Sequence, residues 1–304
     1  MITGRTVALL SFVSANLLLL IVTGLFPLLN YTGHLRPDVF NWTTCDRLAL
    51  TYPLPYSPEP WAIESAFVMV LAWQGLWLLY TLVVDVLYSR VCSGDDYNPP
   101  SSASFVMYTF LLLADAGFLA WMLLFDRVDD PSLSLVGSFA ALCCALFLSS
   151  IGTVVAVALH TAANARDGEE EETSRWRARI SGFLAGNGSG AVTAGLWVAF
   201  VLALGILLRY RAGVDSGVVR DAGLGVMTAG TSLYWLADTL LLDPAGYTTY
   251  VLSPYSVLCT IAAGMLSAHL HDPFVQGVLG LLAGFLLIKT GLSLYRWWVM
   301  MYRK

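Results

Sequence analysis

Eight apolar stretches, each long enough to cross a lipid bilayer as a helix, constrain the fold of this chain more than any other feature. A transmembrane helix needs about 20 mostly apolar residues. The stretches that meet this need are Val7 to Leu29, Ala62 to Tyr88, Ser104 to Phe125, Leu133 to Leu159, Ala191 to Leu208, Ala222 to Leu242, Thr248 to Ala268 and Pro273 to Val299. Little of the chain remains between them, so we expect a single transmembrane domain over residues 1–304.

The composition supports a protein embedded in membrane lipids. Hydrophobic residues make up 57% of the chain and charged residues only 12%, whereas a soluble domain carries about 25% charged residues. The alternation of apolar and polar residues that marks a membrane β-barrel is absent, so a helical bundle is the architecture that satisfies the backbone in lipid. We therefore predict an all-α, polytopic membrane protein with eight transmembrane helices, and its net charge of −5 argues against nucleic acid as a partner.

The polar interval of residues 30–61 indicates which side of the membrane its loop occupies. It contains two N-glycosylation sequons, at Asn30 and Asn41, together with Cys45 and five prolines. Glycosylation acceptors are used on the luminal or extracellular side, so we expect a luminal loop here. Asn41 is the better acceptor, because Asn30 lies next to the membrane.

The arginine distribution supports the same topology. The first apolar run of 23 residues is longer than the roughly 7–15 residues of a signal-peptide core, so we expect it to remain as the first helix. Eight spans then put both termini on one side. With the termini in the cytosol, nine Lys and Arg residues lie on the cytosolic side against six on the other, the bias expected for an N-in, C-in protein.

Residues 160–190 form the largest interval on the predicted cytosolic side. An acidic run, Glu169 to Glu172, precedes Arg175, Arg177 and Arg179. Opposite charges four residues apart stabilise a solvated helix, so we expect a cytosolic loop with a short helix beside the bilayer. The formal sequon at Asn187 should stay unglycosylated on this side.

Cys45 is the one cysteine of five that this topology places on the oxidising side. Such a thiol is either free or joined to another chain, and an oxidising compartment favours the disulfide. We therefore expect an intermolecular disulfide at Cys45. No cysteine and histidine spacing resembles a zinc site, and we expect no bound metal.

Catalytic motifs are absent from the sequence. The four histidines lie in loops or at span ends, whereas haem binding in a bundle needs paired histidines inside the spans. The sequence has no glycine-rich phosphate loop, nucleophile elbow or HExxH pattern. We expect neither a cofactor nor catalytic residues, and we do not expect an enzyme.

Three charged residues lie deep within the predicted spans: Asp115, Asp238 and Lys289. A charge in hydrocarbon is costly unless it is paired or faces a wet cavity. Asp238 and Lys289 each lie about 24 Å from the luminal end of their span at the helical rise per residue. Their matched depth predicts a structural ion pair, and a proton or ion path is the alternative.

Glycines mark possible contact faces on the later spans. Gly223 and Gly230 lie in the sixth span, and Gly280 and Gly284 in the eighth. Small residues four positions apart let two helices approach closely. We expect the Gly280 and Gly284 pair to pack inside the bundle.

In these features the chain resembles the herpesvirus envelope glycoprotein M family. The shared features are eight spans, the Phe26-Pro27 step into the first loop, Asn41-Trp42-Thr43 beside Cys45, and Asp115 in the middle of the third span. Leu28 stands where the family has a cysteine after Phe-Pro. The resemblance implies a glycosylated envelope protein joined through Cys45 to a small membrane glycoprotein.

The function we expect is that of a multi-pass glycoprotein of the secretory pathway (Golgi or endosome) or of a virion envelope. It would act in envelope assembly or trafficking through membrane-protein partners. Two alternatives stay open: a small-solute or proton transporter that uses Asp115, Asp238 and Lys289, and an intramembrane hydrolase that uses Asp115 and Asp238 as acid and base.

Overall fold

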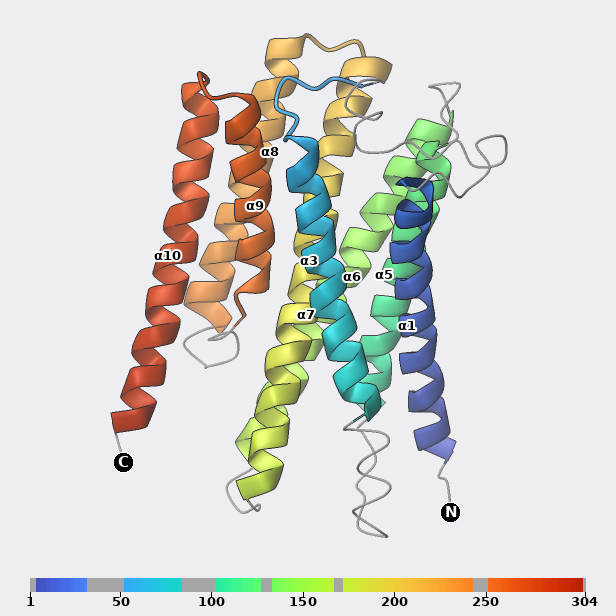
Figure 1. Ribbon diagram of the computed structural model, residues 1–304, viewed down its shortest axis with the longest axis vertical. Helices are drawn as coiled ribbons and strands as arrows, with labels where there is room; N and C mark the ends of the chain where they lie inside the picture. The colour runs from blue at the N-terminus through green and yellow to red at the C-terminus, as the bar shows by residue number, and fades with distance from the viewer. Residues whose placement is uncertain are drawn as a thin grey trace.

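The protein forms an elongated bundle of upright helices in a computed structural model that describes residues 4–31, 52–83, 102–126, 133–166, 172–242 and 251–302. All regular secondary structure in these ranges is helical. Helix α1 begins and α10 ends at the same end of the bundle (Figure 1). Both ends of the described chain therefore lie at the same end of the bundle, the arrangement that the predicted topology requires.

Each of the eight predicted apolar stretches overlaps a helix. Helices α7 and α8 continue into π-helical turns, labelled η3 and η4. The helices are α1 (Gly4–Tyr31), α3 (Pro60–Tyr80), α5 (Ser102–Asp126), α6 (Leu133–Arg166), α7 (Glu172–Ile206), η3 (Leu207–Arg211), α8 (Ser216–Leu236), η4 (Ala237–Leu242), α9 (Ser253–Ala268) and α10 (Pro273–Tyr302).

Several of these helices have the length and composition of membrane spans. The described residues contain five such helices, which cover Pro60–Val83, Phe105–Leu124, Val136–Ala156, Ile180–Arg211 and Pro273–Arg296. Leu10–Gly24 and Ser253–Ala268 are shorter apolar helices. The all-helical architecture is therefore confirmed, with five helices in the described residues long and apolar enough to cross a membrane, while the count of eight spans and the orientation stay predictions.

Residues 160–190, predicted as a cytosolic loop with a short helix, are more helical than expected. Helix α6 continues to Arg166, and α7 begins at Glu172 rather than at Ala191. From Leu184 to Gly190 every residue is buried. Most of these residues are small or polar, but they pack against other helices, and α7 continues through them.

Helix α7 is the central helix of the bundle. Half of the residues in its most apolar 18-residue stretch are buried, against 22–28% in the corresponding stretches of the other four span-length helices. Helices α1, α5 and α6 lie on one side of it and α8, α9 and α10 on the other (Figure 1). Helix α3 contacts α7 and α9 and so joins the two groups.

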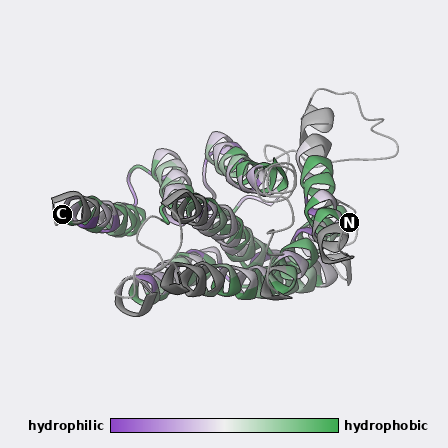
Figure 2. Ribbon diagram, turned by 90° about the horizontal axis from the view of Figure 1, so that it is seen from below, coloured by the Kyte–Doolittle hydropathy of each residue, from purple (hydrophilic) through white to green (hydrophobic). Residues whose placement is uncertain are grey.

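The outward faces of the helices are apolar. Exposed large side chains occur on most of them, including Leu18, Val68, Phe147, Val154, Leu233 and Leu287. The hydropathy colouring in Figure 2 shows apolar residues along the described helices. An outer surface of this kind is suited to contact with lipid chains.

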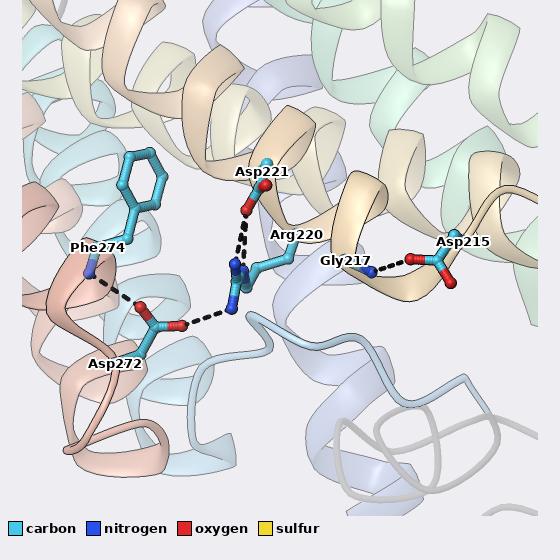
Figure 3. Close-up of polar contacts among 6 residues, drawn as sticks. All are labelled: Asp215, Gly217, Arg220, Asp221, Asp272 and Phe274. Atoms are coloured by element: carbon cyan, nitrogen blue, oxygen red, sulfur yellow. Dashed lines mark hydrogen bonds and ion pairs between the residues drawn. The ribbon is translucent and has the colours of Figure 1, made fainter.

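Aspartates set the starts of two helices at one end of the bundle. The Asp215 carboxylate accepts a hydrogen bond from the Gly217 backbone N–H at 2.7 Å, which caps α8. Asp272 accepts one from the Phe274 N–H at 2.9 Å at the start of α10. Figure 3 shows both contacts. Such caps satisfy backbone donors that a helix start leaves without an intrahelical partner.

Candidate functional site

A buried charge cluster, consisting of Asp238, Tyr255 and Lys289, lies between the last three helices. The Lys289 Nζ atom is 2.8 Å from Asp238 Oδ2. The Tyr255 hydroxyl donates a hydrogen bond to the same oxygen at 2.6 Å. The Lys289 side chain is 0% exposed and that of Asp238 is 1% exposed. The predicted pairing of Asp238 with Lys289 is confirmed.

Three different elements supply the cluster. Asp238 is in η4, Tyr255 is in the first turn of α9, and Lys289 is in α10. One turn before the ion pair, the rings of Trp235 and Phe285 stack with their centroids 4.8 Å apart. The ion pair and the ring stack, one turn apart, therefore together set the register of α10 against α8 and η4.

The cluster carries no net charge when Asp238 and Lys289 are ionised. A lone carboxylate or ammonium in this position would lack a counter-charge, whereas the paired charges neutralise each other and the tyrosine hydroxyl adds a hydrogen bond. Its chemistry suits it to holding three helices together. The second carboxylate oxygen, Asp238 Oδ1, has no hydrogen-bond partner among the described residues.

Asp115, the third intramembrane charge, lies in a different part of the bundle. Its Oδ2 atom accepts a hydrogen bond from Gln74 Nε2 at 2.6 Å, which links α5 to α3. Both side chains are buried. Helix α5 packs on α1 and α6, on the opposite side of α7 from the charge cluster (Figure 1). The structure therefore does not bring the three charges into one site.

Asn187 has a structural role that the sequence analysis missed. Its Oδ1 atom accepts hydrogen bonds from the backbone N–H groups of Leu252 at 3.0 Å and Ser253 at 2.9 Å. These donors begin α9, whose own N-cap residue, Leu252, offers no side-chain cap. Asn187 of α7 thus caps a neighbouring helix, and its burial leaves no room for a glycan in the folded protein.

The glycines around Asn187 allow this contact. A Cβ at Gly186 would lie 2.7 Å from Val251, one at Gly188 would lie 2.9 Å from the Trp77 ring, and one at Gly190 would lie 2.8 Å from Pro254. Real Cβ atoms essentially never come this close. The run Gly-Asn-Gly-Ser-Gly inside an apolar span is the sequence signal that could have identified this junction.

The other glycine pair behaves differently from our expectation. No described residue comes within 4 Å of the position that a Cβ would take at Gly280 or Gly284. The predicted packing of these two residues inside the bundle is therefore wrong. In contrast, a Cβ at Gly223 would collide with the Tyr56 ring.

Residues 52–59, the last part of the predicted luminal loop, are bound to one end of the bundle. Tyr56 is fully buried and donates a hydrogen bond to the Val201 carbonyl at 3.0 Å. Its ring lies over Gly205 of α7 and Gly223 of α8. Burial raises the pKa of Tyr56, so the hydroxyl keeps its proton and remains a donor.

Further contacts hold the same segment. The Tyr210 hydroxyl donates to the Pro53 carbonyl at 3.0 Å, and His269 Nε2 lies 3.2 Å from the Ser57 carbonyl oxygen. The backbone N–H of Glu59 donates to the Gly264 carbonyl at 3.2 Å. The segment is therefore fixed to elements on both sides of it.

An exposed ion-pair network joins the starts of α8 and α10 at this end (Figure 3). The Arg220 guanidinium lies 2.9 Å from Asp221 and 3.2 Å from Asp272. The hydrogen bond to Asp221 and the negative charges of both aspartates raise the pKa of Arg220. The guanidinium thus stays charged and bridges the two helix starts.

The remaining predicted site residues lie largely outside the described residues. Asn41 and Cys45 are not among them, and Asn30 is described only as the second-last residue of α1. The three cysteines within the described ranges, Cys143, Cys144 and Cys259, form no disulfide. Within the same ranges no group of three or more potential metal ligands occurs.

Comparison of the chain with protein-family models, with curated proteins and with solved structures finds no match.

Proposed function

We propose that this chain is a membrane-embedded glycoprotein of the secretory pathway or of a virion envelope that acts through membrane-protein partners. The observation that carries the proposal is that the buried charged residues bond to partners on neighbouring helices. Asp238 pairs with Lys289 and Asp115 with Gln74, each across a helix interface. These contacts fix helices to one another, which leaves the surfaces of the bundle to carry the function.

The two rival functions each need charges that converge on one site. An intramembrane hydrolase would place two carboxylates on one substrate, as acid and base. Asp115 and Asp238 instead have separate partners on opposite sides of α7. The same separation counts against a transport path that uses Asp115, Asp238 and Lys289 together.

The luminal loop is the region that best fits partner binding. Its sequon at Asn41 and its cysteine at Cys45 lie a short distance before the segment 52–59 in sequence. Tyr56 and Glu59 anchor that segment to the helices. An anchored base lowers the entropy that a loop loses when it binds another protein. The resemblance to the glycoprotein M family points to the same loop.

Electrophoresis without and with reducing agent tests the proposal. In membranes from cells that express the native partner, we expect a higher-mass species that reduction removes. Cys45→Ser should abolish it, and Cys259→Ser, which changes a half-buried thiol in α9, should retain it. A monomeric band without reductant, together with alkylation mapping that finds Cys45 as a free thiol, would contradict the proposal.

A further inference from the structure

Buried polar atoms without a partner concentrate along one face of α8 and η4. Within the described ranges, these atoms include Thr231 Oγ1, Trp235 Nε1, Asp238 Oδ1 and Thr239 Oγ1. Thr231, Trp235 and Asp238 follow one another at spacings of four and three residues, so they share a helix face. The side chains of Thr231 and Asp238 are each only 1% exposed.

Helix α7 carries a further buried polar atom next to α8. The indole ring of Trp197 lies against Gly230, where a Cβ would collide with it. Its Nε1 atom is buried and has no partner among the described residues. Consecutive helix positions point about 100° apart, so Gly230 and this indole lie outside the face that carries Thr231.

Other threonines in the bundle show that the two free hydroxyls are unusual. Thr228, one turn before Thr231, donates to the Leu224 carbonyl at 2.8 Å, the usual bond of a helical threonine to the fourth residue before it. Four further threonines make the same bond: Thr23, Thr109, Thr153 and Thr260. Thr231 and Thr239 do not, so their hydroxyls remain available.

We propose that this face is an internal water-binding seam, formed by Thr231, Trp235, Asp238 and Thr239. A buried polar atom without a hydrogen bond costs about 1–3 kcal/mol, and one buried water typically makes about three hydrogen bonds to such atoms. The seam offers a carboxylate oxygen that accepts, hydroxyls that both donate and accept, and an indole N–H group that only donates. Water satisfies all three kinds of group, whereas a metal cation would be repelled by the N–H donor.

The seam leads to the charge cluster. Water at Asp238 Oδ1 would complete the hydrogen bonding of the carboxylate, whose other oxygen already accepts from Lys289 and Tyr255. The ion pair is then solvated on one side and packed on the other. This inference is independent of the proposed function, because it concerns the interior of the bundle and not its partners.

Radiolytic labelling of the full-length protein in detergent tests for bound water. Tyr255 is 1% exposed and Tyr56 is 0% exposed, so radicals from bulk water reach neither ring. Radicals formed from water in the seam would reach Tyr255 alone. We expect Tyr255 to be modified several times faster than Tyr56, even with a scavenger in the bulk solvent. Equal rates for the two tyrosines would overturn the proposal.

Valine substitutions give a second readout whose sign separates a wet seam from a dry one. Thr231→Val and Thr239→Val remove a hydroxyl with little change of shape, and Thr228→Val is the matched control. If the seam is dry, removing an unsatisfied hydroxyl raises the Tm above that of the control, which would overturn the proposal. We expect an unchanged or lower Tm, and slower modification of Tyr255 in Thr231→Val.

Discussion

Removing one member of the buried ion pair should be among the most damaging single changes to this protein. Lys289→Met leaves the Asp238 carboxylate with Tyr255 as its one partner among the described residues, in a place where both charged side chains are at most 1% exposed. Leaving one buried charge uncompensated costs about 3–5 kcal/mol. Total stabilities of folded domains are about 5–15 kcal/mol, so the loss is a large share of the whole.

The double neutral variant separates the cost of an unpaired charge from the loss of side-chain shape. Asp238→Asn alone leaves the ammonium of Lys289 unpaired and should cost about as much as Lys289→Met. Combining the two changes removes both charges, and replacing a buried pair by neutral groups of similar volume is often close to neutral. We therefore expect the double variant to be more stable than either single variant. The charge-swapped variant, Asp238→Lys with Lys289→Asp, should recover only part of the stability. It restores an ion pair, but the surrounding side chains, including Tyr255, fit the native arrangement.

Fluorescence-detected gel filtration and thermal unfolding in detergent measure these differences. Arg220→Gln is the matched control, because it breaks an ion pair at the exposed end of the bundle, and exposed pairs contribute little. We expect both single variants to lose folded yield and Tm while the control keeps both. If the double variant is as unstable as the single ones, the two charges are not coupled and the reasoning fails.

Three further predictions follow from the packing. Gly223→Ala should cost about 1–3 kcal/mol by overpacking against Tyr56, while Gly284→Ala, with no described neighbour within 4 Å, should unfold at an equal or higher temperature; equal losses would contradict the packing. Asn187→Ala removes the cap of α9 and should cost about 1–3 kcal/mol, read as faster hydrogen exchange at the start of α9 than in the native protein. Tyr56→Phe should cost about 1 kcal/mol by thermal unfolding, and a much larger loss would show that the hydroxyl does more than bind Val201.

The helices were predictable because lipid solvation imposes a simple rule on the sequence. A span must satisfy its backbone internally and present apolar side chains, so runs of apolar residues mark each helix before any contact is known. The ion pair was predictable for a related reason. The constant rise of a helix converts residue number into depth in the membrane. Two opposite charges at the same depth lower the free energy by pairing, because each is costly when it is buried alone. Asp238 and Lys289 met both conditions.

The start of α7 could not be predicted by the same rule. Asn187 and its small neighbours lower the hydropathy of the segment and so suggest that it lies outside the membrane. The side-chain oxygen of Asn187 is satisfied by backbone N–H groups at the start of α9, which is more than 60 residues away in sequence. A hydrogen bond between distant segments cannot be inferred from local composition, because the partner donors exist only once α9 has packed against α7.

Two glycine pairs with the same spacing show where sequence patterns stop being informative. Gly186 and Gly190 contact α9 closely, whereas Gly280 and Gly284 face no described neighbour. The spacing states only that a close approach is permitted, and which helix approaches depends on how all of them pack. For α10 the deciding contacts are instead those of Phe285 with Trp235 and of Lys289 with Asp238. Among lipid chains, apolar surface gains little free energy by packing on other apolar surface. A directional charge pair therefore specifies the position of α10 better than a groove of small residues does, and no described residue packs on Gly280 or Gly284.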